Sequence, residues 1–195
     1  MGSEDLLSKI KNIITERGTD SYLGEEVTME QHMLQTALLA ETEDGSDSAI
    51  AGALLHDIGH YSEAFAEEAL EQGLNNFHED SGAQILEGTF PENVVASVKF
   101  HVSAKRYLCA TDTNYFNCLS EASVHSLKLQ GGPMDENEIL EFEKNPHLEL
   151  CLKVRRWDDS AKVPGIKTPP FSHYLPSEAG RTGQPESECD RHPGS

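Results

Sequence analysis

The sequence of 195 residues predicts an all-α fold. Apolar residues recur at helical spacing in most segments, and no alternating run is long enough to indicate a strand. From Pro164 onward Pro, Gly and Ser accumulate, and the last twenty residues contain almost nothing that could be buried. We therefore expect one helical domain over residues 1–175 and a disordered tail over residues 176–195.

Three helices are expected in the first third of the chain. Residues 3–17 repeat apolar side chains three and four positions apart, which is typical of an amphipathic helix. Thr28, with Gln31 three residues later, reads as a capping box that opens a second helix to about residue 41. After the turn-forming stretch EDGSDS, a third helix is expected from about residue 48 to residue 60.

The helices expected after residue 77 are placed mainly by Gly and Pro. A helix near residues 78–87 should end at Gly88, and Pro91 suits the first position of the next helix. Two longer helices are then expected over residues 114–130 and 135–158, because the segment QGGP breaks the chain between them.

Composition excludes several classes of protein. The formal net charge of −19 argues against nucleic acid or an anionic membrane as a partner. No apolar stretch approaches the roughly 20 residues that a membrane-spanning helix needs, and no signal-like segment begins the chain. The four cysteines have no paired spacing, so a reduced, cytoplasmic setting is expected. Basic residues gather between positions 99 and 156, which leaves room for a small anionic substrate.

Six polar side chains fall where the helical pattern predicts a buried face. They are His32, His56, Asp57, His78, His101 and Asp158. A single such histidine is more often a core residue bonded to a backbone carbonyl than a metal ligand. Several together favour a metal centre, since each unpartnered buried polar group would cost a kcal/mol or more. Imidazoles and carboxylates without thiolates suit iron, manganese or zinc.

The adjacent pair His56 and Asp57 predicts how the ligands divide. Neighbouring residues on a helix point about 100° apart, so they cannot easily bind one side of one ion. A carboxylate can instead bridge two ions with its two oxygens. We therefore expect His32, His56 and Asp158 on one ion, His78 and His101 on the other, and Asp57 between them.

The pattern H…HD…D, formed by His32, His56-Asp57 and Asp158, resembles the HD-domain superfamily over about residues 25–160. This resemblance implies a helical bundle with a metal site in its core, and most superfamily members are phosphohydrolases. The segments YLGEEVTMEQHMLQ, ALLHDIGHY, HVSAKRYL, QGGPMDE and CLKVRRWD are further similar to the PhnZ-type HD-domain oxygenases of phosphonate catabolism, in order and with similar spacing as far as Tyr174.

The oxygenase resemblance implies a mixed-valent Fe(II)/Fe(III) pair as cofactor. The implied reaction uses O2 to cleave the carbon–phosphorus bond of 2-amino-1-hydroxyethylphosphonate, giving glycine and phosphate. Tyr22 would occupy an iron position until substrate displaces it, and Glu25 would receive the substrate ammonium. The implied phosphonate-binding residues are His60, Lys105, Ser123, Gln130 and Arg155. Asp57, His60 and Lys105 are the candidate catalytic residues.

Spacing supports two of these roles without the resemblance. Lys105 lies one helical turn after His101, and Arg155 lies one turn before Asp158. A dianionic phosphonate near the metal ions would need such cations. A salt-bridged surface is the alternative for both residues. Asp159, next in the chain, is expected to be an exposed charge.

Other functions remain compatible with these residues. The same six ligands could serve a metal-dependent phosphohydrolase, or a helical binding module with a structural metal. Within the oxygenases, the substrate could be an N-trimethylated 1-hydroxyphosphonate. Glu25 favours the primary amine, because a quaternary amine cannot donate a hydrogen bond and is usually bound by an aromatic cage. A hydroxylase acting on 2-aminoethylphosphonate would be the natural metabolic partner.

Overall fold

The computed structural model describes residues 3–22, 24–61 and 77–175. Within these ranges the chain is helical, which confirms the expected all-α class, and the β-structure is limited to one isolated bridge between Ser21 and Thr28. The helices before residue 100 are α1 (Ser3–Arg17), α2 (Met29–Glu43), α3 (Asp47–Leu55), the 3₁₀ turn η1 (Ile58–Tyr61), α5 (His78–Leu86) and α6 (Glu92–Lys99). Those after it are α7 (His101–Thr111), α8 (Thr113–Asn117), α9 (Glu121–Leu129), α10 (Glu136–Phe142), α11 (Leu148–Ser160) and η2 (Phe171–Tyr174).

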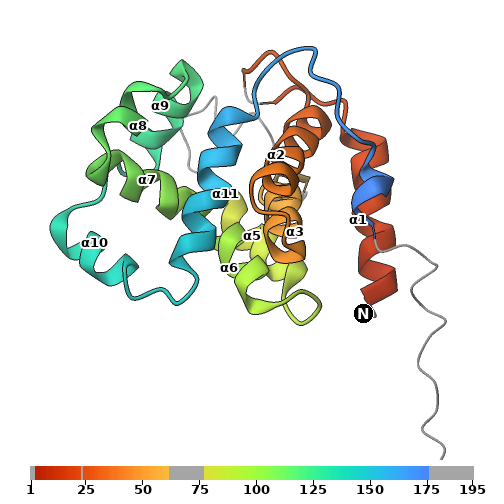
Figure 1. The fold of residues 1–195 in the computed structure, drawn as a ribbon, viewed down its shortest axis with the longest axis horizontal. Coiled ribbons are helices and arrows are strands. Elements are labelled where there is room, and N and C mark those ends of the chain that lie inside the picture. The colour runs from red at the N-terminus through yellow and green to blue at the C-terminus, as the bar shows by residue number, and fades with distance from the viewer. Residues whose placement is uncertain (1–2, 23, 62–76, 176–195) are drawn as a thin grey trace, which may run out of the picture.

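Helices α2, α3 and α11 form the centre of the molecule, with α5 and α6 beside them (Figure 1). Helix α1 lies on one side, and α7 to α10 lie on the other. The last described segment, η2, returns to α1, so that the two ends of the described chain lie together. None of the described helices is long and apolar enough to cross a membrane.

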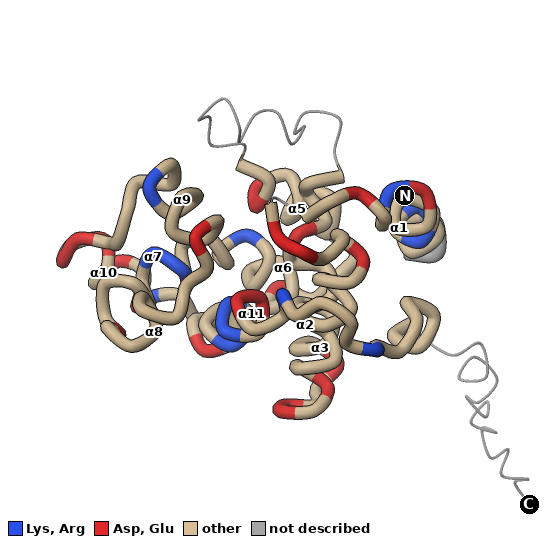
Figure 2. Tube along the Cα trace, turned by 90° about the horizontal axis from the view of Figure 1, so that it is seen from above, with Lys and Arg blue, Asp and Glu red and all other residues tan. Residues whose placement is uncertain are grey.

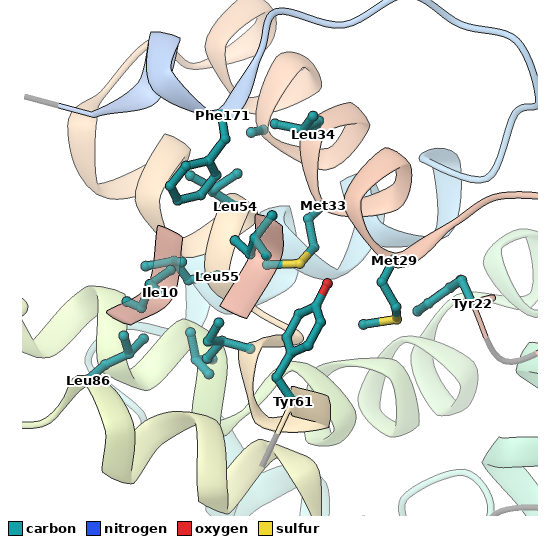
Figure 3. Close-up of a cluster of buried hydrophobic side chains, with 14 of the residues drawn as sticks. Ile10, Tyr22, Met29, Met33, Leu34, Leu54, Leu55, Tyr61, Leu86 and Phe171 are labelled. Atoms are coloured by element: carbon teal, nitrogen blue, oxygen red, sulfur yellow. The ribbon is translucent and has the colours of Figure 1, made fainter. Parts of the chain in front are cut away.

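The largest hydrophobic cluster joins α1 to the central helices. Figure 3 shows Ile10 of α1 packing near Leu54 and Leu55 of α3, with Phe171 of η2 above them. Figure 3 also shows the ring of Tyr61 reaching toward Met33 of α2. A second cluster packs α11 against α2 and α3, and a third joins α6, α7, α10 and α11. These contacts hold the helices that carry the polar residues named above.

The capping box at Thr28 is present, and it starts α2 as expected. Helix α5 ends one residue earlier than its expected range, and Gly88 follows with a φ of 75°, the left-handed conformation that glycine adopts readily. Pro91 lies one residue outside α6, as its N-cap rather than its first residue.

Three predicted helices are wrong in extent. The helix expected through residue 60 ends at Leu55, and a turn and η1 follow. Gly59 explains the change of path, since its backbone packs directly on α5, where any Cβ would overlap the carbonyl oxygen of His78. The helix expected over residues 114–130 is two helices, because Ser120 caps the backbone of α9 with its side chain.

The helix expected over residues 135–158 is also two helices, α10 and α11. Pro146 lies between them and cannot continue a helix, because it lacks an N–H and excludes the α conformation from the residue before it. The expected disordered tail, residues 176–195, lies outside the described residues, as does the segment 62–76.

Candidate metal centre

The six predicted ligands meet in the middle of the helical bundle. They come from five parts of the chain, and each is at most 6% exposed. Their positions are the end of the first turn of α2 (His32), the end of α3 (His56), the turn after it (Asp57), the first residues of α5 and α7 (His78 and His101), and the last turn of α11 (Asp158). Residues that are far apart in sequence therefore share one buried site.

One group of ligand atoms surrounds the Oδ2 atom of Asp57. Nε2 of His32 and Nε2 of His56 lie 3.1 Å apart, and they lie 3.5 Å and 3.2 Å from Asp57 Oδ2. Oδ1 of Asp158 lies 3.4 Å from His32 Nε2 and 3.8 Å from His56 Nε2. Ligands bound at about 2.1 Å to one ion are about 3 Å apart, so this spacing fits a metal ion between them.

A second group surrounds the other oxygen of the same carboxylate. Nε2 of His78 and Nε2 of His101 lie 2.8 Å apart, and they lie 3.4 Å and 3.5 Å from Asp57 Oδ1. Asp57 therefore presents one oxygen to each pair of histidines. This is the arrangement expected of a carboxylate that bridges two ions.

Backbone carbonyls fix the orientation of three of the imidazoles. Nδ1 of His32, His56 and His101 lies 3.0, 2.8 and 2.6 Å from the carbonyl oxygens of Ala161, Ala53 and Val98 respectively. A carbonyl can only accept, so Nδ1 carries the proton in each ring. In the neutral ring Nε2 then keeps its lone pair and points into the centre, as a metal ligand must.

Charge in the centre also favours a cation. Burial alone would raise the pKa of Asp57, but His56 and hydrogen bonds from the surrounding histidines hold it well below its usual value. Burial would lower the pKa of His56, yet Asp57 and Asp158 raise it to about 9. Asp57 Oδ2 and Asp158 Oδ1 are buried, and among the described residues neither has a hydrogen-bond donor in ideal geometry; the nearest histidine Nε2 atoms lie at 3.2 to 3.8 Å. A metal ion would supply the missing positive charge, so the residues fit a metal centre.

Arg155 fixes the second carboxylate of the centre. Its Nη1 donates to Oδ2 of Asp158 at 2.6 Å, which leaves Oδ1 of Asp158 directed at His32. Its Nε and Nη2 bind Asp159, and the Tyr115 hydroxyl also contacts that carboxylate. Asp159, which was expected to be exposed, is thus a largely buried partner of Arg155, with a side chain 13% exposed. That expectation was wrong.

A cavity opens beside the metal centre, and its wall brings together all the predicted substrate residues. Those on the wall are Tyr22, Glu25, His60, Lys105, Ser123, Gln130 and Arg155. Acidic residues dominate the molecule, whereas basic residues are present on α7, α9 and α11 (Figure 2). Lys105 of α7 and Arg155 of α11 line the cavity. Their roles in binding remain predictions.

The surroundings of Lys105 and His60, two of the predicted substrate residues, lower their pKa values. Nζ of Lys105 donates to Oγ of Ser126 at 2.9 Å, and burial, with repulsion from Arg155, lowers the pKa of this lysine to about 7. Burial, with repulsion from His78, lowers the pKa of His60 to about 3. Near neutral pH Lys105 can therefore exist in both its charged and its neutral form, whereas His60 stays neutral.

Tyr22 lies over the first group of ligands. Its ring stacks on that of His32, with centroids 4.0 Å apart. Burial, together with Asp57 and Asp158, raises the pKa of its hydroxyl well above 10. Glu25 accepts a hydrogen bond from Ser120 at 2.7 Å, so the carboxylate is held at the start of α9.

Sequence reasoning missed Lys162, which also lines the cavity. It lies four residues after Asp158, and its Nζ donates to Oγ of Ser123 at 2.9 Å. The spacing rule that selected Lys105 and Arg155 would have found it, had it been applied beyond the predicted end of the last helix at residue 158. Ser126, the partner of Lys105, was missed too.

Comparison with known proteins agrees with this geometry. The family model described as HD domain matches residues 29–140, more than half of the chain. The chain belongs to the HD-domain family. It is 48% identical to [1-hydroxy-2-(trimethylamino)ethyl]phosphonate dioxygenase (glycine-betaine-forming) of Leisingera caerulea, over 88% of each chain. It is 46% identical to the hydroxymethylphosphonate dioxygenase of Gimesia maris, over 79% of this chain and 77% of that one.

A third relative is more distant. An uncharacterized protein of Acanthamoeba polyphaga mimivirus is 32% identical over 86% of this chain and 78% of its own. The HD-domain match ends at residue 140, before Asp158, Arg155 and Lys162. Helix α11 and the loop after it therefore complete the HD-domain site from outside the matched region.

Proposed function

We propose that the protein is an iron-dependent dioxygenase that cleaves the carbon–phosphorus bond of 2-amino-1-hydroxyethylphosphonate, giving glycine and phosphate. Two relatives that cover most of the chain are named as dioxygenases of hydroxyphosphonates, which supports an oxidoreductase of this class. The observation that carries the proposal is the position of the metal centre, which forms one end of a cavity that also holds Lys105, Arg155 and Glu25.

His32, His56 and Asp158 would hold one iron ion, His78 and His101 the other, and Asp57 would bridge them. The two ligand groups around the two oxygens of Asp57 support this division. Imidazole and carboxylate donors are compatible with iron. When bound, the iron pair would supply the redox chemistry with O2, and the protein residues supply binding, orientation and charge.

The phosphonate would lie between Lys105, Ser123, Gln130, Arg155 and His60. A buried ammonium and a buried guanidinium stabilise a dianion more strongly than exposed cations do, because little water competes for them. The hydroxyl of Tyr22, whose ring stacks on His32, would occupy the metal position until the substrate displaces it. The reaction balances with one O2 per substrate and no other reductant, since C2H8NO4P and O2 together contain the atoms of glycine and phosphoric acid.

Glu25 supports a substrate with a primary ammonium at C2, which can donate to its carboxylate. Among the described residues on the cavity wall, Tyr22 carries the single phenol or phenyl ring, whereas cages for quaternary amines use several aromatic rings. The trimethylated substrate is the second candidate, since the relative of 48% identity is named for it. A hydroxylase acting on 2-aminoethylphosphonate would supply the primary amine.

The test uses iron-loaded protein and three substrates: the primary amine, its trimethylated form and hydroxymethylphosphonate. EPR before and after substrate addition should show a coupled Fe(II)/Fe(III) signal that the substrate changes. In air, phosphate and glycine should then appear in equal amounts, with O2 consumed, and kcat/KM should be highest for the primary amine. Phosphate release without O2 would replace the proposal with a phosphohydrolase, and preference for another substrate would overturn the assignment of the amine.

A further inference from the structure

Lys162 is the cation nearest to Glu25 on the cavity wall. Its Nζ lies 3.7 Å from Oε1 of Glu25, 3.6 Å from Oδ1 of Asp159 and 3.9 Å from Oδ1 of Asp158. The same Nζ lies over the ring of Tyr22, 5.8 Å from its centroid. Three carboxylates and an aromatic face therefore surround one ammonium, and all of them belong to the protein.

These neighbours are the groups that bind an alkylammonium ligand. Carboxylates attract the charge, and an aromatic face adds a cation–π contact. Two of the carboxylates have another partner, since Arg155 binds both Asp158 and Asp159. Glu25 has no arginine beside it among the described residues, and its charge faces Lys162 instead. An incoming ammonium that pairs with Glu25 would meet Lys162 as its competitor.

Lys162 can move from this position without breaking a hydrogen bond to a carboxylate. It comes two residues after the end of α11, and its hydrogen bond among the described residues is the one to the neutral hydroxyl of Ser123. Its distances to the carboxylates are too long for hydrogen bonds, so a small displacement loses no directional contact with them. A lysine side chain also has a flexible four-carbon stem, which allows the ammonium to move while the backbone stays in place.

We propose that the Lys162 ammonium occupies the site of the substrate ammonium in the free protein, and that an alkylammonium-bearing phosphonate displaces it from Glu25. Lys162 is then a specificity-determining residue, because its competition for Glu25 sets how much a positive charge on the ligand increases the affinity of the protein for that ligand. This inference rests on the proposed function for the phosphonate, and it adds the residue that tunes selection between aminated and unaminated phosphonates.

The test measures binding rather than turnover. Calorimetry on the iron-loaded protein measures the Kd values of 2-aminoethylphosphonate and methylphosphonate. Both ligands carry the phosphonate, and only the first carries the additional carbon with the amine. We expect Lys162→Met to raise the ratio of the two Kd values, in favour of the aminated ligand, at least tenfold. Lys162→Gln, which keeps a polar side chain for Ser123, should raise it in the same direction. Lys128→Met, an exposed lysine on α9, is the matched control and should leave the ratio unchanged.

Glu25→Gln completes a double-mutant cycle. In its presence Lys162→Met should no longer change the ratio, since the carboxylate for which the two cations compete is gone. An equal weakening of both ligands by Lys162→Met would overturn the inference and make Lys162 a phosphonate-binding residue. An unchanged ratio in both Lys162 variants would overturn it too. Neither binding measurement uses O2, so its result can be interpreted even if the protein proves not to be a dioxygenase. If turnover is normal but the Kd ratio is unchanged, the inference about Lys162 is refuted and the proposed function stands.

Discussion

Replacing Lys105 with methionine should stabilise the protein while abolishing phosphonate binding. The residue is 3% exposed, and burial lowers its pKa from 10.5 to about 7. At about 1.4 kcal/mol per pH unit, holding the charged amine inside the fold below pH 7 costs about 5 kcal/mol. Metal cations nearby would lower the pKa of Lys105 further, because they also repel the charged amine. A methionine of similar length carries no such penalty.

The sign of this effect predicts its pH dependence. Between pH 7 and 10.5 the unfolded chain binds a proton at Lys105 that the folded chain has released, so the wild-type protein gains stability as pH rises through this window. The variant lacks this contribution. After about 2 kcal/mol is allowed for the lost hydrogen bond to Ser126 and for imperfect packing, Lys105→Met should be more stable by about 3 kcal/mol at pH 6 and nearly equal at pH 9.5.

Urea unfolding of iron-loaded wild type and variant at pH 6 and pH 9.5 measures this difference. Lys99→Met, at an exposed position on α6, is the matched control and should change stability little at either pH. A stability gain that is equal at both pH values would refute the reasoning, because it would show that packing rather than charge is responsible. A loss of stability at pH 6 would refute it as well.

Three further substitutions test the centre. Asp57→Asn should remove both metal ions and most activity, as metal analysis and turnover measurements would show. If the variant kept one full equivalent of metal per chain, the proposal that Asp57 bridges the two ions would be contradicted. Gly59→Ala should destabilise the fold by about 1–3 kcal/mol, measured by urea unfolding, because its Cβ would overlap the His78 carbonyl oxygen; an unchanged midpoint would mean that η1 and α5 separate freely. Asp159→Asn leaves Arg155 with one carboxylate, Asp158, and so loosens the side chain that orients this metal ligand. Competition with a chelator should show that metal affinity falls about 10–100-fold. An unchanged affinity would limit Asp159 to a structural role.

The ends of the helices show which structural features depend on residues that are close in sequence and which depend on tertiary contacts. The capping box at Thr28 acts through atoms three residues apart, so the sequence predicts it correctly. Pro146 and Ser120 also act locally, but they lie inside segments whose apolar spacing continues across them, and the expected long helices hid both breaks. The end of α3 at Leu55 has no such local signal, because it depends on the contact of Gly59 with α5.

The sequence by itself determined the all-α class and the six buried polar residues, because amphipathic periodicity and the cost of burying a lone polar group are properties of short segments. It also selected Asp57 as the residue able to face two ions. Only the tertiary structure decided that its two oxygens face different histidine pairs and that Asp159 pairs with Arg155. It alone placed Lys162 beside Glu25. These relations join atoms from distant helices, and packing of the bundle, rather than any local preference, sets those distances.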